Sequence, residues 1–124
     1  MTGLIGISLG DVTGVGPEVT LKAIAAELPA DDSRYVLIGD EGTVQRINFQ
    51  LGLKLSIAPL GTAPASARIL ITNPLPNPLP EDLVDGSPIA ARAAVAWLKD
   101  GAERCLRQEL DALVTAPVNK EAIV

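Results

Sequence analysis

The stretch LIGISLGDVTGVGPE, residues 4–18, decides the fold. Residues 4–9 form an apolar, strand-like run, and a helical pattern follows the turn. The turn contains Gly14 and Gly16, and glycines allow backbone N–H groups to approach a ligand closely. The order strand, glycine-rich turn, helix therefore predicts an α/β fold with a ligand crevice at the turn.

The residues at the start of this helix bear on which ligand the predicted crevice could bind. Pro17 suits the first turn of a helix because its missing N–H is not needed there. Glu18 complements the positive end of the helix dipole but would oppose an anion bound at the same place. The glycine spacing, Gly-x3-Gly-x-Gly, matches neither the dinucleotide fingerprint nor a P-loop. The motif thus indicates a crevice without naming its ligand.

Strand and helix patterns alternate along the rest of the chain. Strands are predicted at 3–9, 35–38, 53–57, 68–72 and 111–115, and helices at 16–28, 41–51 and 88–108. This alternation predicts a layered, mostly parallel sheet with flanking helices and right-handed crossovers. Ligands of such sheets bind beyond the carboxyl ends of the strands. The turns at 10–18 and 115–120 are therefore expected at the same edge.

The longest helix is predicted to begin after a proline-rich connection. Residues 73–88 contain five prolines, too many for a helix or a central strand. Ser87 is the expected N-cap, and Pro88 the first helical residue. Helical spacing predicts an inward-facing stripe on this helix, made of Val95, Leu98, Ala102, Cys105 and Leu106.

Composition excludes several classes of protein. The chain has 124 residues, 48% of them hydrophobic and 20% charged, which is typical of one globular domain rather than a disordered chain. The net charge of −5 and the lack of a basic run argue against partners such as nucleic acid or an anionic membrane. No segment has the length of a membrane span, so a cytoplasmic location is the default expectation. The chain contains no histidine, so it offers neither a histidine base nor a histidine metal ligand.

The final turn carries the polar groups best suited to hold a substrate. Thr115, Asn119 and Lys120 offer a hydroxyl, an amide and an ammonium within one turn after a strand. The structural alternative is that Asn119 caps the next helix while Lys120 is solvated. Asp11 either contacts a ligand, by orienting a substrate hydroxyl or binding a cation, or forms a local Asx turn. Asp40 is interpreted as a turn residue rather than a ribose ligand, because no fingerprint precedes it.

Two motifs together resemble one enzyme family. The sequences GDVTGVGPE (10–18) and ALVTAPVNKE (112–121), in this order, are similar to the 4-hydroxythreonine-4-phosphate dehydrogenase family. The resemblance covers the whole chain but corresponds to about the first third of a family member. It implies an isocitrate/isopropylmalate-dehydrogenase-like fold, here incomplete. Residues 1–124 are therefore expected to be the N-terminal α/β portion of a longer two-domain enzyme, since the chain ends as a helix pattern begins.

The resemblance also implies an activity. Family members oxidise a secondary alcohol with NAD, and loss of carbon dioxide follows, on the route to pyridoxal phosphate. A divalent metal (Zn, Mg or Co) polarises the alcohol oxygen. The family holds it with three histidines, so its ligands are expected outside this chain. A homodimer with active sites between subunits is also implied, acting on a small phosphorylated substrate.

The residues of this chain are assigned binding roles rather than the hydride-transfer step. The expected substrate-binding residues are Asp11, Gly14, Gly16, Thr115, Asn119 and Lys120. This chain alone is expected to be inactive. Two alternatives stay open: a related dehydrogenase for another phosphorylated hydroxy acid or a cyclic diol, and a non-catalytic α/β module that binds a phosphorylated ligand.

Overall fold

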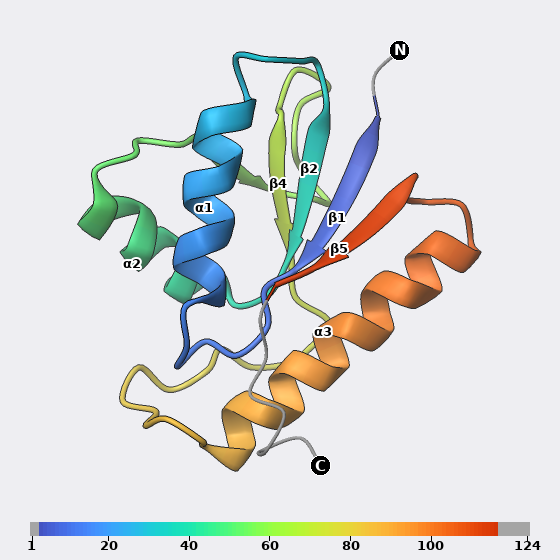
Figure 1. The fold of residues 1–124 in the computed structure, drawn as a ribbon. Helices are drawn as coiled ribbons and strands as arrows, with labels where there is room; N and C mark the ends of the chain where they lie inside the picture. Colours follow the sequence, from blue (N-terminus) through green and yellow to red (C-terminus); the bar gives the residue numbers. More distant parts are fainter. Residues whose placement is uncertain (1–2, 117–124) are drawn as a thin grey trace.

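The computed structural model describes residues 3–116, whose strands and helices alternate along the chain (Figure 1). The strands are β1 (Leu4–Ser8), β2 (Arg34–Ile38), β3 (Ile57–Pro59), β4 (Ile69–Thr72) and β5 (Ala112–Thr115). The helices are α1 (Gly16–Glu27), α2 (Glu41–Leu51) and α3 (Pro88–Leu106). The predicted alternation is confirmed, with most boundaries within two residues of those expected.

The five strands form one sheet in the order β3-β4-β2-β1-β5, and every neighbouring pair is parallel. Helices α1 and α2 cover one face of the sheet and α3 covers the other (Figure 1). The predicted fold class, a layered parallel α/β sheet, is confirmed. Because all crossovers return to the same end, the carboxyl ends of the strands share one edge with the N-termini of the three helices (Figure 1).

The starts of the helices follow from short-range chemistry. The Asp40 side chain accepts a hydrogen bond from the Thr43 N–H at 3.0 Å and caps α2. Ser87 caps α3 as predicted, accepting from the Ala90 N–H at 3.4 Å, and Pro88 follows it. Helix α2 ends at Gly52, whose φ of 66° is left-handed, as is usual for a residue just past a helix.

An aliphatic core fills the space between the sheet and the helices. The central strands are buried on both faces, which explains why they read as continuous apolar runs. The main core side chains are Leu9, Leu21, Ile24, Val36, Leu37, Ile38, Val44, Ile69, Leu70, Ile71 and Trp97. Trp97 is the largest fully buried side chain and anchors α3 to the sheet.

The predicted strand at 53–57 is wrong in position. The strand forms at Ile57–Pro59, and the residues before it form a loop that the Asn48 side chain holds in place. Gly52 and Lys54 both have left-handed backbones, with φ of 66° and 55°, which cannot continue a strand. The Asn48 side chain binds the backbone of Leu55 twice, at 2.9 Å to its carbonyl and 3.1 Å from its N–H. These contacts take the place of a strand partner.

The predicted inward stripe of α3 is also wrong for most of its members, although Cys105 is partly buried against the core as predicted. Val95 and Leu98 are 44% and 40% exposed, and Leu106 is 85% exposed. The buried face is instead built from small residues and one tryptophan: Ala90, Ala91, Ala93, Ala94, Trp97 and Gly101. Gly101 lies against the sheet so closely that an added Cβ would be 2.6 Å from Leu113 Cδ1. Close approach of the helix thus favours the small face over the bulkier one.

No helix in the described part of the chain combines the length and the apolar character needed to span a bilayer.

The burial of Tyr35 on β2 leads to a prediction about alkaline stability. Burial raises the pKa of the Tyr35 phenol above its usual 10.0, and the Asp31 and Glu27 carboxylates raise it further while Arg68 opposes them. Because the pKa of Tyr35 is raised in the folded state, the neutral phenol contributes its full stability below pH 10. That contribution is lost as the pH rises through the pKa of the folded state. We expect Tyr35→Phe to lose less stability than the parent chain above about pH 10, measured by urea unfolding across the alkaline range. Parallel curves for the two proteins would contradict the prediction.

Candidate functional site

The direction of strand order reverses between β1 and β5. From β1 the chain builds outward through β2 and β4, and after α3 it returns to place β5 on the other side of β1. The crossover helices α1 and α3 accordingly lie on opposite faces of the sheet (Figure 1). In open parallel sheets the crevice at such a reversal, beyond the carboxyl ends of the strands, is the usual ligand site.

The first and last predicted turns both start at this reversal. Ser8, the last residue of β1, is in register with Thr115, the last residue of β5. The Ala116 N–H donates to the Ser8 carbonyl at 2.9 Å and extends the pairing past the strand ends. The described chain therefore leaves β1 and β5, two adjacent strands, at the same edge of the sheet.

The turn after β1 is held by its own side chains. Gly10 has a φ of 72°, a conformation that favours glycine, and it redirects the chain out of the strand. Asp11 is 3% exposed, and its Oδ1 accepts from the Thr13 N–H at 2.8 Å and the Thr13 hydroxyl at 2.6 Å. The Gly14 N–H donates to the Asp11 carbonyl at 3.0 Å. Asp11 thus forms the local Asx turn that the sequence left open, with both side-chain contacts on one carboxylate oxygen.

The N-terminus of α1 differs from those of the other two helices. Its N-cap, Val15, provides no side-chain acceptor, whereas Asp40 and Ser87 cap α2 and α3. Gly14 and Val15 are exposed, and Gly16 begins the helix. Within the described residues, the first-turn N–H groups of α1 therefore have no capping side chain.

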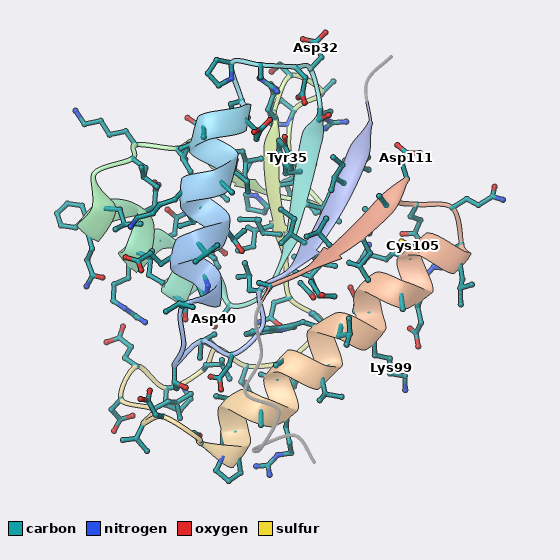
Figure 2. All side chains as sticks on the ribbon, in the orientation of Figure 1. Asp32, Tyr35, Asp40, Lys99, Cys105 and Asp111 are labelled. Carbon is teal, nitrogen blue, oxygen red and sulfur yellow. The ribbon has the colours of Figure 1, made fainter. Side chains whose placement is uncertain are left out.

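Asp40 follows β2 at the same edge and has a structural role. Its Oδ2 accepts from the Thr43 N–H and from the Thr43 hydroxyl at 2.8 Å, and its Oδ1 accepts from the Leu79 N–H at 3.0 Å. Figure 2 shows Asp40 at the end of the molecule where α1 begins, with Asp32 and Asp111 at the opposite end. The interpretation of Asp40 as a turn residue is confirmed, and it also anchors the proline-rich connection.

Asn73 is a residue of this edge that sequence analysis did not single out. It follows β4 directly, and its Oδ1 accepts from the Leu75 N–H at 3.0 Å and from Trp97 Nε1 at 2.9 Å. Asn73 and Asp40 line a cavity of about 470 Å³ at the carboxyl ends of β2 and β4. Its position directly after a strand, like that of Asp40, was the signal available in the sequence.

The structure describes four of the six expected substrate-binding residues. Asp11, Gly14 and Gly16 lie in the β1–α1 turn and at the helix start, and Thr115 ends the adjacent strand. Asn119 and Lys120 lie outside the described residues.

The described residues do not fit a divalent metal. Within residues 3–116, no group of three His, Cys, Asp or Glu side chains converges to hold an ion, and the sequence has no histidine. The β1–α1 turn also lacks the glycine spacing of a dinucleotide site. What this edge offers is backbone N–H groups, a buried carboxylate and an exposed hydroxyl, which can orient a polar substrate.

Known proteins with similar sequences and structures are dehydrogenases that act on phosphorylated substrates, by their names. The chain is 31% identical over 127 residues to the D-threonate 4-phosphate dehydrogenase of Cupriavidus necator, and 29% identical over 124 residues to the 4-hydroxythreonine-4-phosphate dehydrogenase of Desulfosudis oleivorans. The crystal structure of a 4-hydroxythreonine-4-phosphate dehydrogenase from Burkholderia phymatum superimposes with a TM-score of 0.82 at 34% identity, over 99% of this chain. The predicted resemblance is confirmed.

The match to these dehydrogenases covers nearly all of this chain but only part of each relative. Both curated relatives match 97% of this chain, but the chain spans 37% of their length, and it spans 38% of the Burkholderia phymatum structure. No protein-family model matches the chain. The shared fold therefore holds over nearly the whole of this chain and about a third of those dehydrogenases.

Proposed function

We propose that this chain is part of a dehydrogenase that oxidises a small phosphorylated hydroxy acid, with 4-hydroxythreonine 4-phosphate as the first candidate. The observation that carries the proposal is the convergence of the β1–α1 turn and the end of β5 at the reversal of strand order. The two sequence motifs that carry the family resemblance, 10–18 and 112–121, begin in these same two places. D-threonate 4-phosphate is the second candidate, because the name of the relative from Cupriavidus necator gives it as that enzyme's substrate.

The residues of this chain would bind and orient the substrate. Asp11 can accept a hydrogen bond from a substrate hydroxyl, and Thr115 can donate one to an anionic oxygen. Gly14 and Gly16 allow close approach to the backbone at the uncapped start of α1. The proposed set is completed by Asn119 and Lys120, where an ammonium would favour a phosphate.

The remaining parts of the reaction are assigned outside this chain. NAD would accept the hydride from the secondary alcohol, and a divalent metal would polarise the alcohol oxygen as a Lewis acid. Because the described residues offer no metal cluster, the ligands of that ion would come from another part of a longer, two-domain protein. We also propose that the longer protein forms a homodimer whose active sites lie between the two subunits. The 124-residue chain by itself is expected to reduce no NAD when given substrate and a divalent ion.

Substrate binding by the chain itself tests the proposal. We expect 4-hydroxythreonine 4-phosphate to shift the amide NMR signals of residues 10–16 and 115 of the isotope-labelled chain. Thr115→Val should weaken binding about fivefold to tenfold, the value of one ordinary hydrogen bond of about 1 kcal/mol. Thr62→Val, an exposed threonine beyond β3, is the matched control and should leave the affinity unchanged.

Two results would count against the proposal. One is a set of shifts confined to residues away from the carboxyl ends of β1 and β5. The other is equal loss of affinity in the Thr115 and Thr62 variants. Running D-threonate 4-phosphate in parallel ranks the two candidate substrates, and running unphosphorylated 4-hydroxythreonine measures the contribution of the phosphate.

A further inference from the structure

A second cavity lies at the opposite edge of the sheet from the proposed substrate site. It has a volume of about 680 Å³ and opens where β3 and β4 begin and α1 ends. Its walls are largely aliphatic, formed by Leu28, Leu55, Ile57 and Ile69 among others. Cavities of this size and character accommodate small organic ligands.

The charge of the cavity is opposite to that of the chain. The chain carries a net charge of −5, yet the residues that line the cavity include two cations, Lys54 and Arg68, and no carboxylate. An anion in this cavity would therefore meet an apolar wall and a locally positive rim.

Arg68 is held rigidly in the wall. Its Nη1 donates to the Leu28 carbonyl at 2.7 Å, and its Nη2 donates to the carbonyls of Asp31 at 2.7 Å and Ser33 at 2.9 Å. The Asp31 carboxylate lies 3.7 Å from Nη2 and offsets part of the charge. The guanidinium is thus a fixed positive group that costs no further ordering when a ligand binds.

Lys54 has an unusual backbone conformation. Its φ of 55° is left-handed, a region that glycine occupies far more readily than lysine. The two hydrogen bonds between the Asn48 side chain and the Leu55 backbone hold the loop in this shape. Lys54 lines both this cavity and a neighbouring one of about 440 Å³. Backbone strain that the surroundings maintain is often found where a side chain has a binding role.

We propose that this cavity binds a small amphipathic anion, an acid with an aliphatic tail, in addition to the substrate site at the other edge. The tail lies against Leu55, Ile57 and Ile69, and the carboxylate pairs with the Lys54 ammonium near Arg68. The site is independent of the proposed dehydrogenase function, because none of its lining residues belongs to the β1–α1 turn or to β5.

Octanoate and 1-octanol test the proposal because they share a tail and differ in charge. We expect octanoate, below its critical micelle concentration, to shift the amide NMR signals of residues 54–58 and 67–69 of the 124-residue chain. Lys54→Gln should weaken octanoate about threefold to fivefold, the upper range for an exposed ion pair, and leave 1-octanol unchanged. Leu55→Ala should weaken both compounds, since it removes part of the apolar wall.

The control is Lys22→Gln, which removes another exposed lysine, on α1. It should bind octanoate as the parent chain does. The proposal is overturned if octanoate shifts residues outside the lining, or if Lys54→Gln and Lys22→Gln weaken octanoate equally. It is also overturned if Lys54→Gln weakens 1-octanol as much as octanoate, because the lysine would then act through the fold rather than through its charge.

Discussion

Replacing Trp97 by alanine is expected to lower the free energy of unfolding by about 3–5 kcal/mol. Trp97 is fully buried at the centre of α3, among the alanines that bring the helix close to the sheet. Its Nε1 also donates to Asn73 Oδ1 at 2.9 Å, so truncation removes a hydrogen bond along with the ring. Domains of this size have total stabilities of about 5–15 kcal/mol. Urea unfolding followed by circular dichroism measures the loss.

Two further variants separate the causes. Trp97→Phe retains an aromatic ring but loses the hydrogen bond to Asn73, and it should cost about 1–2 kcal/mol. Leu106→Ala is the control on the same helix, because Leu106 is 85% exposed and its truncation should change stability by less than about 0.5 kcal/mol. If Leu106→Ala were as damaging as Trp97→Ala, the assignment of the buried face of α3 would be wrong.

The second large effect is expected for Gly39→Ala, at about 2–3 kcal/mol of destabilisation. A Cβ at Gly39 would lie 2.2 Å from Leu9 Cδ1 and 2.7 Å from Leu9 Cγ. Leu9 is fully buried, so any shift of its side chain would disturb the packed core around it. The clash lies where β1 and β2 end, since the Leu9 N–H donates to the Ile38 carbonyl at 3.1 Å. The same substitution should therefore also shift the NMR signals of the Gly10–Gly16 turn.

Gly61→Ala is the matched control for the Gly39 variant. No atom lies within 4 Å of an added Cβ at Gly61, so this change should be neutral or slightly stabilising, by up to about 1 kcal/mol. Equal unfolding midpoints for the two alanine variants would show that β1 and β2 tolerate separation at their carboxyl ends. The close approach of Gly39 to Leu9 would then not contribute to stability.

Local patterns predicted much of the fold. The continuous apolar run at 35–38 indicated a strand covered on both faces, and Ser87-Pro88 marked the start of α3 within the first turn. These predictions succeeded because capping and apolar periodicity act between residues that are close in the sequence. The interpretation of Asp40 as a turn residue succeeded for the same reason, since its Thr43 partner is three residues away.

Predictions that depended on distant contacts were less successful. The stripe through Val95 and Leu98 and the stripe through Ala94 and Trp97 have the same helical spacing, so periodicity could not choose between them. The choice depends on how closely α3 approaches the sheet, which Gly101 permits. The strand expected at 53–57 did not form because the left-handed Lys54 and the Asn48 contacts to Leu55 shape the α2–β3 loop, and neither has a signal in an alternating pattern.

The sequence by itself determined the α/β class, the glycine-rich turn after the first strand and the resemblance of two motifs to one enzyme family. Each of these is encoded in adjacent residues, through backbone freedom, capping and apolar runs. Only the tertiary structure decided that β5 pairs with β1 and so brings Thr115 beside the end of the first strand. That pairing joins residues more than a hundred positions apart, and it depends on the crossover of α3 across the sheet rather than on any preference local to either strand.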